Sequence, residues 1–242
     1  MENQIDQLYS EIVVLNSQIH KDLKVEPPKD FKKFKQLNSC IILGEEFAEA
    51  CKYYPIVFVK NPQEGITPVV ILGFENNAFI DHEDKWKEGY YIPAFVRRYP
   101  YILVEEKKDK EGERKLFVAI DKNFEGYGSE SGERLFNDEG ENTEYLNKVI
   151  DFLRAYDVDY HLTMNFAKKI EELGLLQTIE ATVKLPDNKT FIIKNLFVVN
   201  EEKLRKLKEK DVMDLFSKGF LGWIYAHLIS LNNFVRVARW WF

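Results

Sequence analysis

Two adjacent arginines, Arg97 and Arg98, lie between aromatic residues and prolines in the stretch GYYIPAFVRRYP, residues 89–100. A guanidinium group can pair with a carboxylate or phosphate through two parallel hydrogen bonds, and nearby aromatic rings can stack on a sugar or a peptide. The same residues can instead close one end of a core, with the arginines bonded to carbonyls or to acids such as Asp138 and Glu139. Both interpretations stay open. The candidate ligand-binding residues are Arg97, Arg98, Trp86, Tyr91 and Tyr99.

Metal and catalytic chemistry have weaker support. The sequence HED at 82–84, together with His161, matches the ligand types of a non-haem iron site. His82 also lies in an acidic run typical of a solvated turn, and matches of three residues are common by chance, so we expect no metal and no cofactor. The sequence contains no nucleophile elbow, phosphate-binding loop or dinucleotide-binding glycine pattern. We therefore expect no catalytic residue, and an enzyme is the less favoured alternative.

The composition indicates a folded protein of 242 residues, with 45% hydrophobic and 31% charged residues. Aromatic residues reach 14%, enough for a core and for a stacking surface. The net charge of −6 argues against a nucleic-acid partner, which would need a basic face.

The two cysteines and the first residues bear on the compartment. Cys40 and Cys51 match no metal-ligand spacing, and we expect free core thiols in a reducing cytoplasm. The chain begins with polar and acidic residues, whereas a secretory signal needs positive charge and then an apolar run. No stretch is a convincing transmembrane helix. These patterns predict a cytoplasmic protein, with peripheral contact at the inner membrane left open.

We expect paired strands to form the framework that positions most of the candidate binding residues. Each pair is rich in β-branched or apolar residues and is split by a polar turn, which predicts antiparallel hairpins. The predicted pairs are 55–60 with 67–75, 99–107 with 114–122, and 175–186 with 189–200.

Helical patterns fill much of the remaining sequence. We expect a helix over 44–54, and two more over 143–157 and 160–174, with Thr143 as N-cap of the first and Gly174 ending the second. A charged helix follows Asn200, its predicted cap. The pattern predicts an α+β fold in one domain over 1–242, with a lead-in at 1–14 and an aromatic tail at 236–242.

The last helix is apolar, and helical spacing predicts that Leu221, Ile224, Leu228 and Leu231 face the core, with His227 a buried core histidine. The tail after it combines positive charge with interfacial aromatic residues. We expect the tail to contact the protein's own body, a second copy or a membrane surface, in that order. Its residues are Arg236, Arg239, Trp240, Trp241 and Phe242.

Several segments together resemble the SapC family of bacterial proteins, in that family's order, from about Leu15 to Leu231. The segments are LNSQIHKDLKV, YYPIVFVK, PVVILGF, DKWKEGYYIPAFVRRYPYIL, LFNDEGENTEYLNKVIDFL, LGLLQTIEATVKLPDN and IYAHLISL. The family takes its name from genes for bacterial surface-layer proteins and their secretion. The resemblance therefore implies a bacterial protein linked to surface-layer material, and it implies no particular reaction.

Two functions from different classes follow. The leading expectation is a non-enzymatic accessory or binding protein of surface-layer biogenesis or export, with a surface-layer or secretion component as its partner. The alternative is an enzyme that acts on a cell-surface glycan or peptide and uses Arg97 and Arg98 to hold an anion. A glycan or a peptide would be the ligand in that case.

Overall fold

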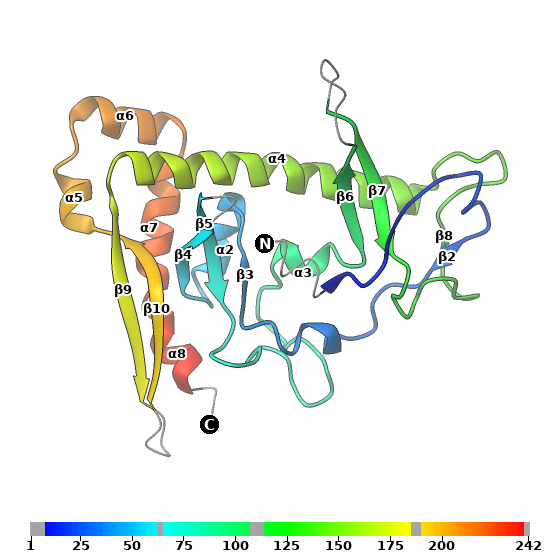
Figure 1. Ribbon diagram of the computed structural model, residues 1–242, viewed down its shortest axis with the longest axis horizontal. Coiled ribbons are helices and arrows are strands. Elements are labelled where there is room, and N and C mark those ends of the chain that lie inside the picture. Colours follow the sequence, from blue (N-terminus) through cyan, green and yellow to red (C-terminus); the bar gives the residue numbers. More distant parts are fainter. Residues whose placement is uncertain (1–7, 62–64, 107–113, 185–189, 240–242) are drawn as a thin grey trace. The chain divides into compact units, whose positions relative to one another are not determined.

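A computed structural model describes residues 8–61, 65–106, 114–184 and 190–239 (Figure 1). Contacts along the backbone divide the chain into two compact units. Unit 1 consists of Met1–Asp30 and Val96–Val158, and unit 2 of Phe31–Phe95 and Asp159–Phe242. The single domain expected over 1–242 stays a prediction.

Unit 1 contains two small antiparallel sheets. The larger has the strand order β1-β7-β6, with β1 at Ile12–Val14, β7 at Leu116–Asp121 and β6 at Tyr101–Glu105. The smaller pairs β2 (Lys24–Val25) with β8 (Glu133–Arg134). The predicted hairpin of β6 and β7 is confirmed, because the charged stretch between them separates two apolar segments that pair residue by residue.

Unit 2 is built on a five-stranded antiparallel sheet, which contains both other predicted hairpins. Its strand order is β3-β5-β4-β10-β9. The strands span Ser39–Ile41 (β3), Gly65–Ile71 (β5), Ile56–Asn61 (β4), Thr190–Val199 (β10) and Leu176–Lys184 (β9). Together with the helices, this sheet confirms the predicted α+β class.

Helix α4 (Glu144–Glu172) is continuous, so the prediction of two helices over 143–157 and 160–174 is wrong. Residues 157–160 contain no glycine or proline, and nothing in them prevents helical backbone geometry. The predicted ends are correct. Thr143 Oγ1 accepts a hydrogen bond from the Leu146 amide at 3.3 Å, and Gly174 has a φ of +64°, which glycine adopts without strain.

Short helices precede α4 in the sequence. They include η1 (Lys32–Phe34), η2 (Gly44–Glu46), α2 (Phe47–Ala50) and α3 (Ala94–Arg97). The helix predicted over 44–54 is thus shorter than expected. Gly44 begins it at a point of close approach, because a Cβ added there would lie 2.3 Å from the Trp223 ring. Of the two predicted core thiols, Cys40 is buried, whereas Cys51 is only half-buried.

The C-terminal part of the chain forms four helices among the residues described. They are α5 (Glu201–Arg205), α6 (Glu209–Ser217), α7 (Phe220–Ser230) and α8 (Asn233–Arg239). Asn200 caps α5 as predicted, since its Oδ1 accepts the Lys203 amide at 2.9 Å. Within the described ranges, no helix is both long enough and apolar enough to cross a bilayer. Trp240, Trp241 and Phe242 lie outside the described residues, so their predicted contacts stay predictions.

The buried face of α7 agrees with the prediction at Ile224 and His227 and differs from it at the leucines. Leu221, Leu228 and Leu231 are only half-buried, and the buried side chains of α7 are Phe220, Ile224, His227 and Ser230. The spacing of leucines identified an apolar stripe, but the helix turns its histidine and serine toward β4, where the backbone offers polar partners. The need to pair the backbone groups of Ile56 therefore determines which side chains of α7 are buried.

An aromatic cluster forms the core of unit 2 around Phe166, a fully buried residue in the second half of α4. Its ring centroid lies 5.2 Å from Phe220, 5.3 Å from Trp223, 6.0 Å from Phe47 and 6.1 Å from Phe58. Part of the high aromatic content thus packs around α4, α7 and the sheet. Buried aromatic pairs at these separations add stability beyond the area that they bury.

Candidate functional site

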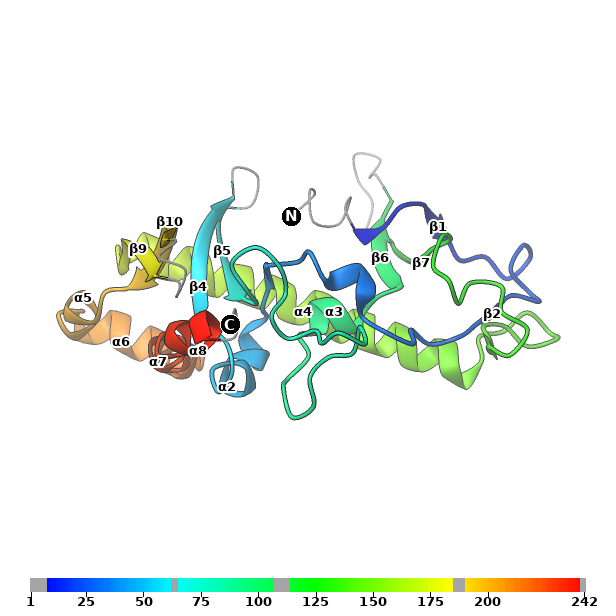
Figure 2. The same ribbon diagram turned by 90° about the horizontal axis from the view of Figure 1, so that it is seen from below.

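A pocket of about 560 Å³ lies in unit 1 between the β1-β7-β6 sheet and the first half of α4. Figure 2 shows these strands above that half of the helix. The pocket is lined by Leu15, Ser17, Leu103, Arg114, Leu116, Phe117, Val118, Phe136, Asn142, Leu146, Ile150 and Arg154. Most of these side chains are apolar, and the few polar groups can orient a ligand, as in small-molecule sites.

Simple periodicities build the two walls. Leu103 of β6 lies opposite Val118 of β7, so both side chains project from the same face of the sheet. On α4, Leu146, Ile150 and Arg154 follow at intervals of four residues, which places them along one face of the helix. The pocket therefore has an apolar sheet wall and a helix wall that changes from apolar to cationic.

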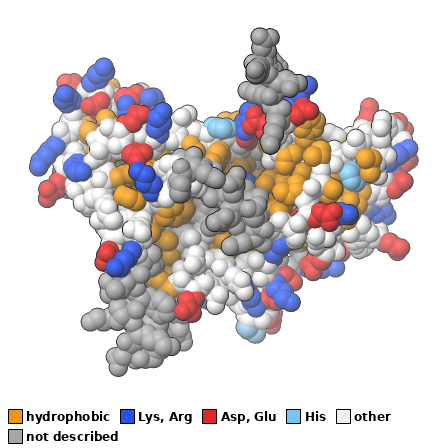
Figure 3. All heavy atoms as spheres, viewed as in Figure 1, with side chains coloured by type: hydrophobic (Ala, Val, Ile, Leu, Met, Phe, Trp, Pro, Cys, Tyr) orange, Lys and Arg blue, Asp and Glu red, His pale blue; other side chains and the backbone are white. Residues whose placement is uncertain are grey.

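The strands also carry an exposed apolar patch. Figure 3 shows apolar side chains gathered over β6 and β7. Ile12, Val14 and Phe117 are 41%, 45% and 40% exposed, a high fraction for such side chains in strands. Val14 pairs with Ala119, two residues from Phe117, so both side chains project from one face. Because successive side chains of a strand alternate, this exposed apolar face is opposite the face that carries Leu103 and Val118.

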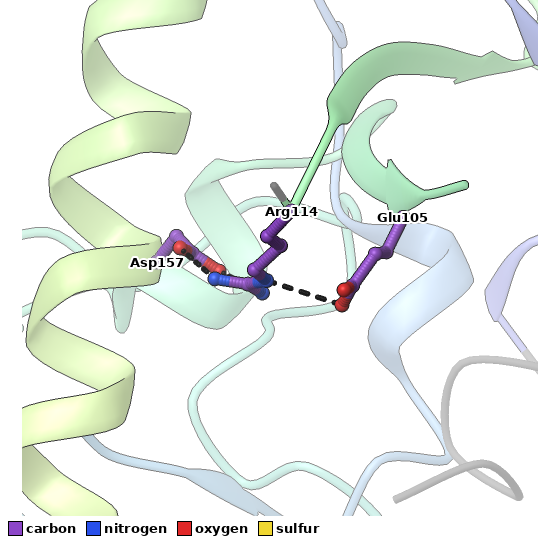
Figure 4. Close-up of polar contacts among 3 residues, drawn as sticks. All are labelled: Glu105, Arg114 and Asp157. Carbon is purple, nitrogen blue, oxygen red and sulfur yellow. Dashed lines mark hydrogen bonds and ion pairs between the residues drawn. The ribbon is translucent and has the colours of Figure 1, made fainter. Parts of the chain in front are cut away.

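Arg114 is held in a fixed position at the pocket wall (Figure 4). Its Nη1 and Nη2 donate to the two carboxylate oxygens of Asp157 at 2.7 and 2.9 Å, and its Nε donates to Glu105 Oε2 at 3.1 Å. Hydrogen bonds to Asp157 and then to Glu105 raise the pKa of Arg114 above its ordinary value. The guanidinium fork is therefore already occupied, and its charge is balanced by two carboxylates.

Arg154 is the second arginine of the pocket and differs from the first. It is exposed and makes no hydrogen bond or ion pair with any residue in the described part of the chain. An exposed guanidinium at the rim of an apolar pocket can bind a carboxylate or phosphate with two hydrogen bonds. Among the described pocket residues, Arg154 is thus the cation available to a ligand.

The two predicted arginines lie elsewhere in unit 1. Arg98 is buried, 7% exposed, with its guanidinium 4.8 Å from the Tyr156 ring centroid. Burial raises the pKa of Tyr9 to about 12, while the charge of Arg98 and its hydrogen bond lower it. Arg97 is exposed, 5.3 Å from the Phe152 ring centroid. Neither arginine lines the pocket.

One acid suggested as a partner of these arginines has another partner. Asp138 pairs with Arg134 at 2.9 Å. Arg134 is four residues before Asp138, and this short spacing brings the two together across the loop.

Tyr99 is also buried in unit 1. Its hydroxyl donates to Asp121 Oδ2 at 3.0 Å, and Asp121 is fully buried. Burial and then the Asp121 charge raise the pKa of Tyr99 above its usual range. The peptide bond before Pro100 is cis. Because a buried carboxylate needs hydrogen bonds, the Tyr99 hydroxyl has a structural role as a donor to Asp121.

Trp86 and Tyr91 belong to unit 2. Trp86 is 7% exposed, and its ring packs edge-on to Phe31 at 5.6 Å and stacks on Phe79 at 6.3 Å, which favours the core interpretation. Tyr91 is half-buried and donates its hydroxyl to Glu46 Oε1 at 2.7 Å. Neither unit contains all five candidate residues. Their role in ligand binding stays a prediction.

The histidines suggested as metal ligands do not form a cluster within the described residues, where no group of three or more metal-ligating side chains occurs. His227 is fully buried, as predicted, and burial lowers its pKa to about 4. Its Nε2 accepts the Val199 amide at 3.0 Å, so its proton lies on Nδ1, which donates to the Ile56 carbonyl at 2.8 Å. This neutral imidazole has a structural role.

The sequence patterns did not identify the pocket residues Arg114 and Arg154. Arg114 follows a charged segment that reads as a solvated turn. Arg154 carries a usable signal, because Leu146 and Ile150 precede it at intervals of four residues. Such spacing places a cation at the end of an apolar helix face.

No curated protein and no solved structure matches this chain. A family match, in contrast, covers nearly the whole sequence. The SapC family model matches residues 15–237, and the chain therefore belongs to the SapC family.

Proposed function

We propose that this protein is a non-enzymatic, cytoplasmic binding protein that serves surface-layer biogenesis or export, and that it holds its partner at the unit 1 pocket. The observation that carries the proposal is the composition of the pocket. Apolar side chains line the pocket beside an exposed cation, Arg154, that is unpaired within the described part of the chain, whereas Arg114 is fixed by two acids. This combination favours binding of a partner with apolar and anionic groups.

The surface-layer context comes from family membership and from the genes for which the family is named. The pocket contributes the binding role. Its lining contains no histidine, cysteine, aspartate or glutamate, so no general acid, base or thiol nucleophile lines it among the residues described. Ser17 lies there without a described histidine or lysine in the lining that could activate it. The enzyme alternative needs Arg97 and Arg98 at a ligand, and the burial of Arg98 gives it no support.

The test is affinity purification of the tagged, full-length protein from its native bacterium, followed by mass spectrometry. Three baits are compared: the wild type, Leu116→Trp, which fills the pocket, and Arg205→Gln, an exposed change on α5 in unit 2. We expect surface-layer subunits or secretion components with the wild type and Arg205→Gln, and their loss with Leu116→Trp. Recovery of small-molecule-processing enzymes alone would overturn the proposal, as would equal recovery with all three baits.

A further inference from the structure

The polar side chains Ser17, Asn142 and Arg154 lie at two ends of the unit 1 pocket, and apolar side chains lie between them. We call this pocket the trough. Ser17 and Asn142 belong to the end near the start of α4, since a Cβ on Gly140, two residues before Asn142, would lie 3.8 Å from the Ser17 side chain. Arg154 marks the other end, one turn before the Asp157 that holds Arg114. Apolar side chains lie between these ends.

The trough has the length of a short extended peptide. From Leu146 to Arg154 the helix rises about 12 Å, at 1.5 Å per residue. An extended chain covers that distance with about four residues, at 3.3 Å per residue. The volume of about 560 Å³ is within the range of pockets that enclose small ligands.

The positive charge of Arg154 favours a ligand whose end near this residue carries a negative charge. Arg114 donates to Asp157 and Glu105, so its charge is compensated. Arg154 has no acidic partner in the described ranges, and a ligand carboxylate would complete its guanidinium fork. At the opposite end, the Ser17 hydroxyl and the Asn142 amide can exchange hydrogen bonds with backbone amide groups.

We propose that the trough binds an extended, apolar peptide segment of about four residues, with a carboxylate on Arg154 and backbone amides near Ser17 and Asn142. This proposal rests on the proposed function and names the ligand class of the same site. A peptide fits the two polar ends better than an alkyl carboxylate does, because an alkyl chain has no amide groups for Ser17 and Asn142. An apolar segment at the carboxyl end of a protein in transit has this chemistry.

The experiment uses the full chain and a fluorescent tetrapeptide of alternating leucine and valine, labelled at its amino end, with either a free carboxylate or an amide at its other end. Fluorescence anisotropy at low salt gives Kd for the wild type, Arg154→Gln and Arg205→Gln. We expect the carboxylate peptide to bind the wild type about tenfold more tightly than the amide peptide, as a charge-assisted bidentate pair would produce. Arg154→Gln should abolish that difference, and Arg205→Gln, which removes an exposed arginine elsewhere, should retain it.

The Leu116→Trp variant tests the apolar wall of the trough, and circular dichroism shows whether this variant is folded. The Arg154→Gln variant tests the same site whether or not Leu116→Trp folds. Equal affinity for the two peptides in the wild type would overturn the proposal. Saturable binding of decanoate without binding of either peptide would also overturn it, and would identify an alkyl ligand. Recovery of secretion components from the bacterium without peptide binding would leave the proposed function in place and remove this ligand alone.

Discussion

The His227 side chain is hydrogen-bonded to the Ile56 carbonyl at a position where strands β4 and β10 of the unit 2 sheet separate. Strands β4 and β10 pair at Val59 with Leu196 and at Phe58 with Phe197, and the same register would bring Ile56 opposite Val199. Instead, the His227 imidazole bridges the two backbones, donating to the Ile56 carbonyl and accepting the Val199 amide. Ser230 Oγ accepts the Ile56 amide at 2.9 Å. Helix α7 thus supplies the hydrogen bonds that the ladder lacks.

The bridge predicts acid sensitivity. Burial lowers the folded-state pKa of His227 to about 4, whereas an unfolded histidine has a pKa near 6.5. The unfolded state therefore binds the proton first as the pH falls, and the stability present above about pH 6.5 is lost toward pH 4. We expect the free energy of unfolding to fall by about 2–3 kcal/mol from this residue between pH 7 and 4.5. Urea unfolding at the two pH values measures it.

The matched variants for this prediction are His227→Gln and His82→Asn. His82 is highly exposed, so its substitution should leave the pH profile unchanged. His227→Gln should be less stable at pH 7 and should show a flatter decline toward acid. If the decline is as steep in His227→Gln as in the wild type, the prediction fails.

Asp159 has the opposite pH dependence. Burial raises its pKa to about 6, with the nearby charges of Glu45 and Glu46 acting in the same direction and hydrogen bonds to the Glu45 amide and Thr163 opposing it. The folded state holds this proton more tightly, so stability from Asp159 is present below about pH 4 and is lost as the pH rises through 6. Asp159→Asn should therefore raise the melting temperature at pH 7 more than at pH 4.5. The exposed control Asp151→Asn should leave it unchanged, and equal shifts in both variants would contradict this expectation.

Arg98→Lys should lose stability although it keeps the charge. The buried guanidinium lies over the Tyr156 ring and bonds to the Tyr9 hydroxyl, and an ammonium group cannot reproduce this planar geometry. We expect a loss of about 1–3 kcal/mol in the free energy of unfolding, the range for hydrogen bonds to charged groups. Arg97→Lys, at an exposed position, should lose less than about 0.5 kcal/mol. Urea unfolding of both variants tests this, and equal losses would show that burial of Arg98 has no energetic consequence.

Two glycines should respond oppositely to alanine. A Cβ at Gly44 would lie 2.3 Å from the Trp223 ring, so Gly44→Ala should cost about 1–3 kcal/mol through overpacking. Gly222 lies inside α7, and a Cβ there meets nothing within 4 Å. Gly222→Ala should therefore stabilise the protein by about 0.5–1 kcal/mol, the difference in helix propensity. Melting temperatures should move in opposite directions, and a stable Gly44→Ala variant would show that the Trp223 ring can shift.

Local signals in the sequence were sufficient for the hairpins and for three helix caps, Thr143, Gly174 and Asn200. The pairs β4–β5 and β9–β10 join apolar segments that are neighbours in sequence, so their pairing needs few distant contacts. Thr143, Asn200 and Gly174 act through the backbone of their own helix, which makes their cap roles readable from residue type and position.

Only the tertiary structure decided which residues meet at the pocket and which side chains of α7 are buried beside Ile224 and His227. Arg114 and Arg154 are 40 positions apart in the sequence, and their roles differ because Asp157 and Glu105 both accept hydrogen bonds from Arg114. Ile224 and His227 are buried as predicted, whereas the three predicted leucines are only half-buried, because His227 and Ser230 face Ile56 and Val199 and bond to their backbone groups. Hydrophobic periodicity records what a helix can bury, whereas distant backbone groups determine which side chains it must turn inward.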